Sequence, residues 1–374
     1  MKNIYMITFH CAYNVGAMLQ CYALSHEIMN SGFKLKVIDY RPKQVMNKNV
    51  EKIWNAGFIE TLKIRAKNVI WYPYHVLISI LKNDKKICVY GGNTAYRFYS
   101  FMREFFPLTD ETLYSEEELS CFRDEDAVFI TGSDQVWNFA LSESPKAYLL
   151  DFVERGSKNS YAASFGKNAI DAKYVRFFEN ALKDFTAITV REKSGVGLVK
   201  EVAGMDAAWV VDPVFLLSKE KWKELAFRPK IRNPYIFLYR VETNPAFIDK
   251  IRELKRNNPE LKVVQFDHFS DGVEADYYCL QKGPIDFLSY LLYSSVVLTN
   301  SFHGTAFSII AGKAAVVLPH SIYNERIDSL MNIVKSSCVD GAYSLDPECG
   351  ALLQEHINYS KKALEAICRE TTSR

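Results

Sequence analysis

The first forty residues alternate between apolar runs and a helical pattern, and this alternation constrains the fold more than any other feature. The apolar run NIYMITF is followed by the loop HCAYNVG. A stripe at helical spacing comes next, at Ala17, Cys21, Leu24 and Ile28. The second apolar run, LKVIDY, completes the pattern. Strand, loop, helix and strand in this order predict a βαβ unit with two parallel strands.

The same alternation recurs later in the chain of 374 residues. It resumes at AVFITGSDQVWN and again at YIFLYRV, which follows a basic stretch with two prolines, AFRPKIRNP. That stretch has the composition of a linker. Because the chain is longer than one hydrophobic core usually supports, we expect two α/β domains with parallel sheets. The predicted bounds are 1–230 and 231–348, with a helical insertion around 43–120 and a last helix within 349–374.

The composition excludes several classes of protein. Apolar residues make up 48% of the chain and the formal net charge is only +2, so we expect a globular protein without a nucleic-acid partner. The eight cysteines form no C-x-x-C pair, and no zinc-type spacing occurs. Scattered thiols in a chain of this length fit a reducing compartment. The first apolar run is too short for the core of a signal peptide. The sequence therefore predicts a cytoplasmic protein without a metal site.

The loop after the first predicted strand is a candidate ligand loop. In open parallel α/β sheets, ligands bind beyond the carboxyl ends of the strands. Asn14 and Gly16 lie there, in front of a helix whose N–H groups could hold an anion. No G-x-G-x-x-G pattern is present, so the dinucleotide fingerprint is missing. Asn14 could equally be an ordinary helix cap in a plain βα turn.

Three more loops place polar residues directly after apolar runs. In FITGSDQVWN, Ser133 and Asp134 either face a ligand or cap a following helix. In YAASFG, Ser164 ends a strand of small residues that allows a close backbone approach. In AITVRE, Arg191 and Glu192 stand at a strand end. An arginine at this place could bind a carboxylate or phosphate with its planar fork, or form an internal ion pair.

The stretch NSFHGTAF (300–307) is the most informative loop. It lies between the apolar run SVVL and the helical stretch TAFSIIAG, so its polar residues fall at the end of a buried strand. Ser301, Gly304 and Thr305 are candidate ligand contacts, and we expect Gly304 to leave the helix N-terminus open to an anion. His303 is the candidate catalytic residue, since histidine titrates near neutral pH and serves both acid and base steps.

Taken in order, these segments resemble the polysaccharide pyruvyl transferase family. The resemblance rests on NVGAMLQCYAL, TGSDQVWN, YAASFG, VREKSG, VVDPVFLL and SFHGTAFSIIAGKAAVVLP, with NERIDSLMNIV in support. It spans nearly the whole chain, and residues 43–120 are its least typical part. The resemblance implies a GT-B-like architecture: two Rossmann-like domains, with parallel sheets facing a central cleft. In such folds the last helix packs back on the first domain.

The resemblance also implies an activity. Similar proteins transfer the pyruvyl unit of phosphoenolpyruvate to a sugar of a surface-polysaccharide precursor, form a cyclic ketal and release phosphate. The donor-binding arginine of the family corresponds to Arg191 and its histidine to His303. A further donor-site arginine of some members has no match here. No cofactor is implied, and the acceptor would be a glycan or a lipid-linked sugar, which could bring the protein to a membrane surface.

Two other functions remain open from the sequence. A GT-B glycosyltransferase that uses a nucleotide sugar would need an acidic or backbone contact to a ribose, and the stretch QFDHFSDGVEAD could provide it. A carbohydrate-binding protein without catalytic activity could be built on the same fold. The retention of both Arg191 and His303 in loop positions argues against this second alternative.

Overall fold

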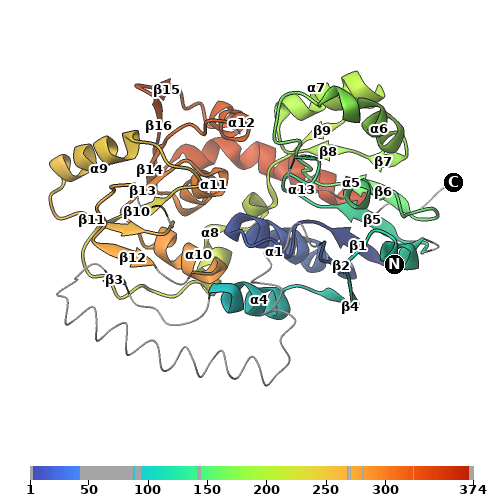
Figure 1. The fold of residues 1–374 in the computed structure, drawn as a ribbon, viewed down its shortest axis with the longest axis horizontal. Helices are drawn as coiled ribbons and strands as arrows, with labels where there is room; N and C mark the ends of the chain where they lie inside the picture. Colours follow the sequence, from blue (N-terminus) through green and yellow to red (C-terminus); the bar gives the residue numbers. More distant parts are fainter. Residues whose placement is uncertain are drawn as a thin grey trace. The chain divides into compact units, whose positions relative to one another are not determined.

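A computed structural model shows a chain divided into two compact units. It describes residues 3–42, 87–88, 94–123, 125–140, 145–267, 269, 271–279, 282–322 and 324–369 (Figure 1). Unit 1 comprises Met1–Lys48, Phe101–Leu217 and Gln354–Arg374, and unit 2 comprises Asn49–Ser100 and Ser218–Leu353. Each unit has its own parallel sheet and its own core, so the α/β fold class predicted from the sequence is confirmed.

Unit 1 is built on a parallel sheet with the strand order β4-β2-β1-β5-β6-β7. Its strands are β1 (Ile4–Ile7), β2 (Leu35–Tyr40), β4 (Leu108–Leu113), β5 (Val128–Thr131), β6 (Ser157–Ser160) and β7 (Phe185–Ala187). The short strands β8 (Thr189–Val190) and β9 (Ala208–Trp209) form a second parallel pair. Single bridges from Asp134 to Ala163 and from Ala163 to Val190 continue the pairing beyond the strand ends. The candidate loops therefore start from adjacent strands.

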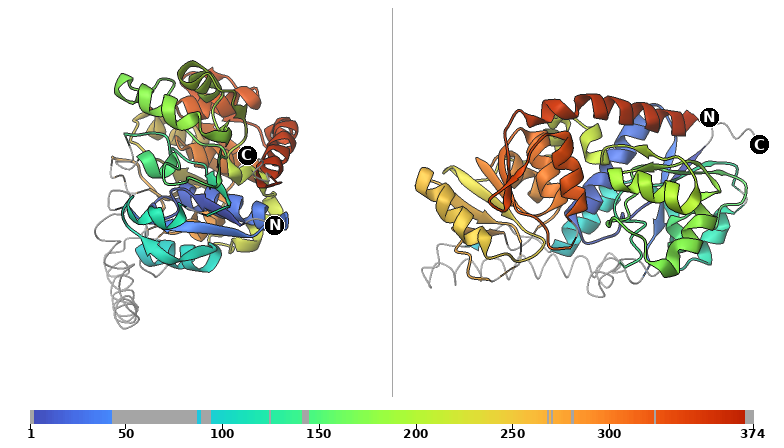
Figure 2. Two further views of the ribbon diagram at one scale, coloured as in Figure 1. Left: turned by 90° about the vertical axis from the view of Figure 1, so that its right-hand side faces the viewer. Right: turned by 90° about the horizontal axis from the view of Figure 1, so that it is seen from above.

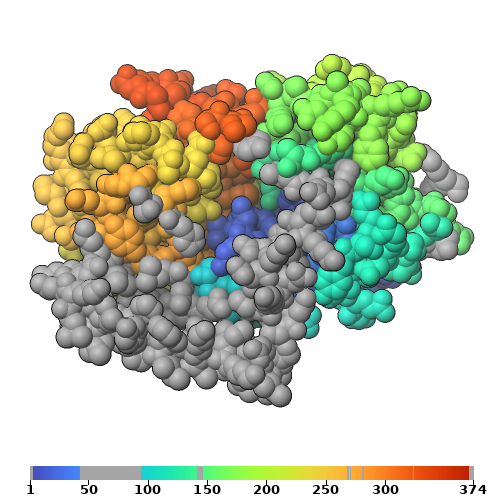
Figure 3. All heavy atoms as spheres, in the orientation of Figure 1, coloured from blue at the N-terminus to red at the C-terminus, as the bar shows by residue number. Residues whose placement is uncertain are grey.

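The helices of unit 1 connect these strands. They are α1 (Val15–Asn30), α5 (Pro145–Tyr148), α6 (Ala172–Leu182), α7 (Lys193–Ala203) and α13 (Gln354–Arg369), with 3-10 turns η1 (Glu118–Phe122) and η2 (Pro213–Leu216). Helices α6 and α7 pack together, and their residues form the yellow-green face of this unit in Figure 3. Helix α13 returns to α1 and η2, where Lys361 Nζ lies 2.8 Å from Glu27 Oε1 (Figure 2).

Unit 2 is built on a larger sheet with the strand order β15-β16-β14-β13-β10-β11-β12-β3. Its strands are β3 (Ile87–Cys88), β10 (Tyr235–Tyr239), β11 (Lys262–Gln265), β12 (Tyr277–Cys279), β13 (Val296–Thr299), β14 (Ala314–Val317), β15 (Cys338–Val339) and β16 (Ala342–Leu345). All neighbours from β14 to β3 are parallel, and the hairpin of β15 and β16 adds an antiparallel edge. Because β14, β13 and β10 are adjacent, their carboxyl ends meet at one edge.

Helices cover the sheet of unit 2. They are α8 (Lys219–Leu225), α9 (Ala246–Asn257), α10 (Pro284–Leu292), α11 (Phe302–Ala311) and α12 (Glu325–Ile333), with the 3-10 turn η3 (Cys349–Leu353). Helix α11 is buried on nearly all sides, and Gly312 ends it in the left-handed conformation that favours glycine. The almost continuous apolar pattern of this helix follows from its burial.

The structure differs from the predicted organisation at two places. The long segment of the second unit begins at Ser218, not near residue 230, because the Trp222 ring of α8 packs 4.9 Å from the Phe307 ring of α11. The predicted helical insertion over 43–120 needs correction where it is described. Helix α4 (Thr94–Phe105) is helical as expected, but Leu108–Leu113 is the edge strand β4, and Ile87–Cys88 pairs with β12 of unit 2. Residues 43–86 and 89–93 lie outside the described residues.

None of the helices in the described part of the chain combines the length and the apolar character that crossing a bilayer requires.

Candidate functional site

Asn14 of unit 1 is a helix cap in the structure. Its side-chain Oδ1 accepts hydrogen bonds from the backbone N–H groups of Gly16 at 2.8 Å and Ala17 at 3.2 Å. These bonds satisfy two of the N–H groups at the start of α1. The sequence left open whether Asn14 caps a helix, and the structure shows that it does. The Gly16 N–H already donates to this cap. Ligand contacts of Asn14 and Gly16 stay predictions.

Asp134 does not cap a helix, because residues 132–140 form a turn. Its backbone has φ of +80°, a conformation that aspartate tolerates better than most residues. The carboxylate instead accepts a hydrogen bond from the next N–H, that of Gln135, at 2.8 Å. Ser133 precedes it, and the Ser133 hydroxyl lies 3.4 Å from Asp212 Oδ2. The turn thus directs both side chains toward the end of β8.

Arg191 is the centre of a buried ion cluster at the carboxyl edge of unit 1. Its Nη1 donates to Asp212 Oδ2 at 2.7 Å and its Nε donates to Glu192 Oε1 at 3.0 Å. Asp134 Oδ1 lies 4.0 Å from Nη2. Burial would lower the pKa of Arg191, but the carboxylates of Glu192 and Asp212 raise it, and the net shift is upward. The guanidinium is therefore charged and already bonded to acidic partners.

Ser164 extends this cluster to the loop after β6. Its hydroxyl donates to Glu192 Oε1 at 2.7 Å and accepts from the N–H of Gly166 at 3.0 Å. Ser133, Asp134, Ser164 and Glu192, predicted from three separate loops, are thus brought together around Arg191. The sequence allowed for an internal ion pair between Arg191 and an acidic residue, and the structure contains one. A role of Arg191 in donor binding stays a prediction, and it would require an anion to replace a carboxylate.

Sequence reasoning missed Asp212, the partner with the shortest hydrogen bond to Arg191. It follows the apolar run AWVV, so the rule that found the other loops could have found it too. Its Oδ1 also accepts from the Val214 N–H at 3.1 Å and caps η2, which holds the carboxylate in place.

A second buried ion group, at the ends of β1 and β2, was also missed. Asp39 Oδ1 lies 3.0 Å from His10 Nε2 and 2.6 Å from Arg41 Nε, and Arg41 Nη2 donates to Asp39 Oδ2 at 2.6 Å. Burial alone would raise the pKa of Asp39, but the hydrogen bonds and charges of His10 and Arg41 lower it far below its usual value. Asp39 is therefore ionised in the folded protein over the whole physiological range.

His303 lies in the first turn of α11, directly after the carboxyl end of β13. Its side chain is 6% exposed, and its ring is 5.1 Å from that of Phe302 and nearly perpendicular to it. Ser301 is the N-cap, and its hydroxyl accepts from the Gly304 N–H at 3.3 Å. The helix thus starts earlier than the stretch TAFSIIAG suggested, so His303 lies at the strand end as expected but within the helix and not in a loop, and its catalytic role stays a prediction.

Gly304 and Thr305 have structural partners within their own unit. A Cβ on Gly304 would lie 2.4 Å from Thr299 Oγ1, so glycine is required for α11 to approach β13. The Thr305 hydroxyl donates to the Ser301 carbonyl at 2.9 Å within the helix. The expected opening of the helix N-terminus by Gly304 is thus not what the geometry shows, since Ser301 uses its N–H. Contacts of these residues with a ligand stay predictions.

The edge formed by β10, β13 and β14 carries polar residues that the sequence reasoning did not name. Asn300 Nδ2 donates to the Glu242 carbonyl at 3.1 Å, and the Glu242 carboxylate accepts from Ser321 N and Oγ, both at 2.6 Å. His320 Nδ1 lies 3.7 Å from Glu242 Oε2 and accepts from the Ile322 N–H at 3.1 Å. Burial lowers the pKa of His320, Glu242 raises it and Arg326 lowers it further, with a net shift downward. His320 is therefore a neutral group near pH 7.

The acidic stretch after β11 is engaged by an arginine. Arg240 donates to both Asp267 oxygens at 2.7 and 2.8 Å, and to Asp271 at 2.8 and 2.9 Å. Lys282 Nζ lies next to them and donates to the Asp267 carbonyl at 2.7 Å, and burial lowers its pKa to about 8. Asp267 and Asp271, which could have met the ribose of a nucleotide sugar, are thus bonded within the protein.

No group of His, Cys, Asp and Glu side chains in the described parts of the chain has the arrangement of a metal site. The Arg191 and Arg240 clusters are built from arginine–carboxylate pairs, and each places a cation at the carboxyl edge of a parallel sheet. Chemically, such edges can position an anion or a polyhydroxylated substrate, and His303 adds a group that can transfer a proton.

Comparison with solved structures shows the fold. A protein of Listeria monocytogenes, described as a UDP-N-acetylglucosamine 2-epimerase, has a TM-score of 0.52 at 12% identity, over 99% of this chain and 91% of that one. The UDP-GlcNAc 2-epimerase of Neisseria meningitidis gives 0.46 at 12% identity over 97% and 94%. The spinosyn forosaminyltransferase SpnP gives 0.42 at 10% identity over 98% and 94%. The first of these matches, with its TM-score above 0.5, is the one that shows a GT-B-like fold.

The sequence itself was compared with protein families and with curated proteins. No curated protein matches the chain. The sequence pattern of the polysaccharide pyruvyl transferase family matches residues 14–322, which include every candidate loop from Asn14 to Thr305. The match covers most of both units. The chain therefore belongs to the polysaccharide pyruvyl transferase family and is a transferase.

Proposed function

We propose that this enzyme transfers the pyruvyl group of phosphoenolpyruvate to two hydroxyls of one sugar in a surface-polysaccharide precursor. One hydroxyl oxygen adds to the central carbon of the enol while the methylene carbon takes up a proton. The second hydroxyl oxygen displaces the phosphate at the same carbon. The products are a cyclic ketal with a new methyl group and inorganic phosphate. The family match over residues 14–322 is the observation that carries this proposal.

His303 is the residue that we assign to proton transfer. The reaction needs one proton delivered to carbon and protons removed from two sugar hydroxyls, and histidine can serve either step. His303 supports the assignment by its place at the end of β13, the edge where parallel α/β sheets bind ligands. Its low exposure also fits a group that works away from bulk water.

Arg191 is the residue that we assign to the anionic groups of the donor. Phosphoenolpyruvate carries a carboxylate and a phosphate, and an arginine fork matches both. Because Arg191 is bonded to Glu192 and Asp212, donor binding would exchange one anionic partner for another. We further propose that the enzyme acts in the cytoplasm without a cofactor, on a glycan or lipid-linked acceptor.

The test is phosphate release from phosphoenolpyruvate with a panel of free and lipid-linked galactosides, glucosides and mannosides. We expect release that depends on one acceptor class. His303→Ala should lower turnover about 10²–10⁴-fold, the usual contribution of general acid–base catalysis, without a change in melting temperature. His303→Gln should keep a hydrogen bond without restoring proton transfer. Near-normal turnover in His303→Gln would leave only a positioning role, and the absence of release with every acceptor would contradict the proposed reaction.

A further inference from the structure

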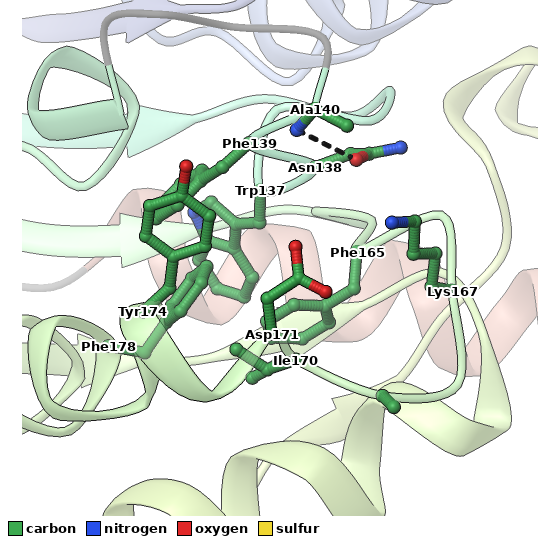
Figure 4. Close-up of a pocket in the computed structure, with 11 residues that line it drawn as sticks. Trp137, Asn138, Phe139, Ala140, Phe165, Lys167, Ile170, Asp171, Tyr174 and Phe178 are labelled. Atoms are coloured by element: carbon green, nitrogen blue, oxygen red, sulfur yellow. Dashed lines mark hydrogen bonds between the residues drawn. The ribbon is translucent and has the colours of Figure 1, made fainter.

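The hollow beside α6 in unit 1 is too small for an organic ligand. Its rings pack on one another: Phe139 stacks on Phe178 with 4.5 Å between the ring centroids, and the Trp137 ring lies 5.2 Å from that of Phe165 (Figure 4). The enclosed space measures about 20 Å³. A cavity of this size has room for a water molecule and for no larger ligand.

Positive charge is concentrated in one short stretch of unit 2. Residues 219–232 comprise α8 and most of the basic stretch AFRPKIRNP, which has the composition of a linker. They contain six lysines and arginines against two glutamates, a net charge of +4. The whole chain has a net charge of only +2, so the rest of it sums to −2. The chain is therefore balanced in charge overall but not in this stretch.

The basic stretch 226–234 is part of unit 2 and packs on α10. The Phe227 N–H donates to the Ser289 hydroxyl at 2.9 Å, and the Phe227 ring lies 6.3 Å from that of Tyr290. Pro229 is buried. These contacts hold the stretch against the helix, so its lysine and arginine side chains start from a fixed place on the surface of this unit.

Three lysines gather where α8 meets the start of β14. Lys219 and Lys223 are one helical turn apart on α8 and so share a face of the helix. Lys219 Nζ lies 3.7 Å from the position that a Cβ on Gly312 would take, and Lys313 is the next residue. Burial lowers the pKa of Lys313, and the positive charges of Lys219 and Lys223 lower it further. The three ammonium groups are thus close enough to repel one another.

An arginine and a tyrosine extend this group along the amino edge of the sheet. Lys313 Nζ donates to the Ser294 carbonyl at 2.6 Å, and the neighbouring Tyr293 ring lies 5.9 Å from the Arg228 guanidinium. Tyr293 is 39% exposed, and Arg228 is exposed too. These residues precede β14, β13 and β10, so they lie at the edge opposite to that of His303. We define the basic patch as Lys219, Lys223, Arg228, Tyr293 and Lys313.

The charge of the basic patch is largely not neutralised by acidic side chains. On α8, Glu224 is paired with Lys221 at 3.0 Å. Lys219, Lys223 and Arg228 make no ion pair with any carboxylate among the residues that the structure describes. Because like charges close together repel one another, an anionic partner at this surface would be bound favourably.

We propose that the basic patch holds the protein on an anionic membrane surface. The negative surface potential of such a membrane attracts clustered lysines and arginines. Tyr293 adds an aromatic ring with a polar tip, a side chain that suits the boundary between lipid and water, and it favours a membrane over a nucleic acid as the partner. A lipid-linked acceptor would lie at the same surface, and only this last point rests on the proposed function.

The test is co-sedimentation of the full chain with lipid vesicles, without phosphoenolpyruvate and without an acceptor. The vesicles contain either a mixture of phosphatidylglycerol and phosphatidylcholine or phosphatidylcholine alone. We expect binding to the mixed vesicles only, and its loss at about 1 M salt, where ions screen charges beyond about 3 Å. Each cation contributes about a fivefold gain in membrane partitioning, so the triple variant with Lys219→Gln, Lys223→Gln and Arg228→Gln should bind roughly a hundredfold more weakly.

The matched control removes three cations from α9 of the same unit, with Lys250→Gln, Arg252→Gln and Arg256→Gln. Lys250 and Arg252 are paired with Glu253 and Asp249 on this helix, at 3.0 and 3.2 Å. The control has the same net charge as the triple variant, and it should bind the mixed vesicles as the parent does. Circular dichroism and melting temperatures verify that both variants are folded.

Four results would overturn the membrane contact. They are equal binding to both kinds of vesicle, no binding to either, unchanged binding in the triple variant, and an equal loss in the triple variant and the control. Binding of a single-stranded RNA that depends on the same three cations, without binding to vesicles, would also overturn it and assign the patch to nucleic acid.

The membrane contact and the proposed reaction can fail separately. Vesicle binding that depends on the basic patch, in a protein that releases no phosphate with any acceptor, would support the contact and contradict pyruvyl transfer. Phosphate release with free acceptors should be the same in the triple variant and the parent, because the patch lies at the edge opposite to that of His303. Release without vesicle binding would leave the reaction standing and overturn the contact.

Discussion

The contact between Gly304 and Thr299 gives the most specific prediction for the fold of unit 2. In Gly304→Ala the new Cβ would lie 2.4 Å from Thr299 Oγ1, an impossible contact, and at a tight 3.1 and 3.2 Å from Cβ and Cγ2 of that side chain. Thr299 cannot turn away without loss, because its hydroxyl donates to the Tyr239 carbonyl at 2.5 Å and accepts from the Ser301 N–H at 3.0 Å. The substitution therefore strains a buried junction of β10, β13 and α11.

The expected loss is the sum of two effects. Overpacking a core typically lowers the free energy of unfolding by about 1–3 kcal/mol, and a weakened buried hydrogen bond adds about 1 kcal/mol. A total of about 2–4 kcal/mol corresponds to a fall in melting temperature of roughly 5–15 °C for a unit of this size. Urea unfolding followed by tryptophan fluorescence measures the total. Hydrogen exchange of the α11 amides shows whether the effect is local.

A second glycine provides the control. Gly197 lies within α7, and an added Cβ there meets nothing within 4 Å. Gly197→Ala should therefore stabilise the protein by about 0.5–1 kcal/mol, because alanine suits a helix interior better than glycine. Combining Gly304→Ala with Thr299→Ala should cost less than the sum of the two single changes, since the closest atom is removed. If Gly304→Ala is as stable as the parent, glycine is not required by packing, and its predicted ligand contact becomes the better explanation.

Three further predictions concern Arg191, Asp39 and the need for a metal. Arg191→Lys keeps the charge but loses the fork: if Arg191 contacts the donor, the dissociation constant of phosphoenolpyruvate rises, whereas an ion pair with a purely internal role would lower only the melting temperature. Asp39→Asn should lower the free energy of unfolding at pH 7 by about 3–5 kcal/mol, the usual loss when one partner of a buried pair is removed. Because the pKa of Asp39 is depressed in the folded state, its contribution is present above about pH 4 and disappears as the pH falls further, so urea titrations from pH 6 to 3 should show a shallower acid loss in the variant. Phosphate release should survive prolonged chelation, and a loss that magnesium or manganese restores would favour metal-dependent transfer from a nucleotide sugar.

The sequence predicted the strands whose own residues are apolar enough to indicate burial. The runs at β1, β5, β10 and β13 are buried on both faces, so they read as continuous apolar segments, and each is followed by a polar loop. Strand β4 could not be predicted in this way, because its sequence LTDETL is polar and its place depends on pairing with β2. Edge strands are specified by their neighbour more than by their own composition.

The sequence identified the loops that form the candidate site, but not the contacts between their side chains. Ser133, Asp134, Ser164 and Glu192 could be found because each follows a strand, and adjacent parallel strands bring their carboxyl ends together. The partner of Arg191, Asp212, lies 21 residues further along the chain, and only the fold shows that its carboxylate is 2.7 Å from the guanidinium.

The Arg191 and Arg240 clusters show why a sequence alone overestimates how available an arginine is for binding a ligand. From the sequence, Arg191 is a cation at a strand end, suited to bind an anion, and Arg240 has the same kind of position at the end of β10 in the structure. In the structure each is bonded to two carboxylates, so the local charge that an anionic donor meets is set by the acids as much as by the arginine. Under the proposed donor binding at Arg191, the donor would compete with Glu192 and Asp212 for the guanidinium, and Ser164 or the start of η2 would keep a displaced carboxylate in place. Affinity would then come from an exchange of partners, and for this reason we expect the geometry of Arg191 to matter more than its charge.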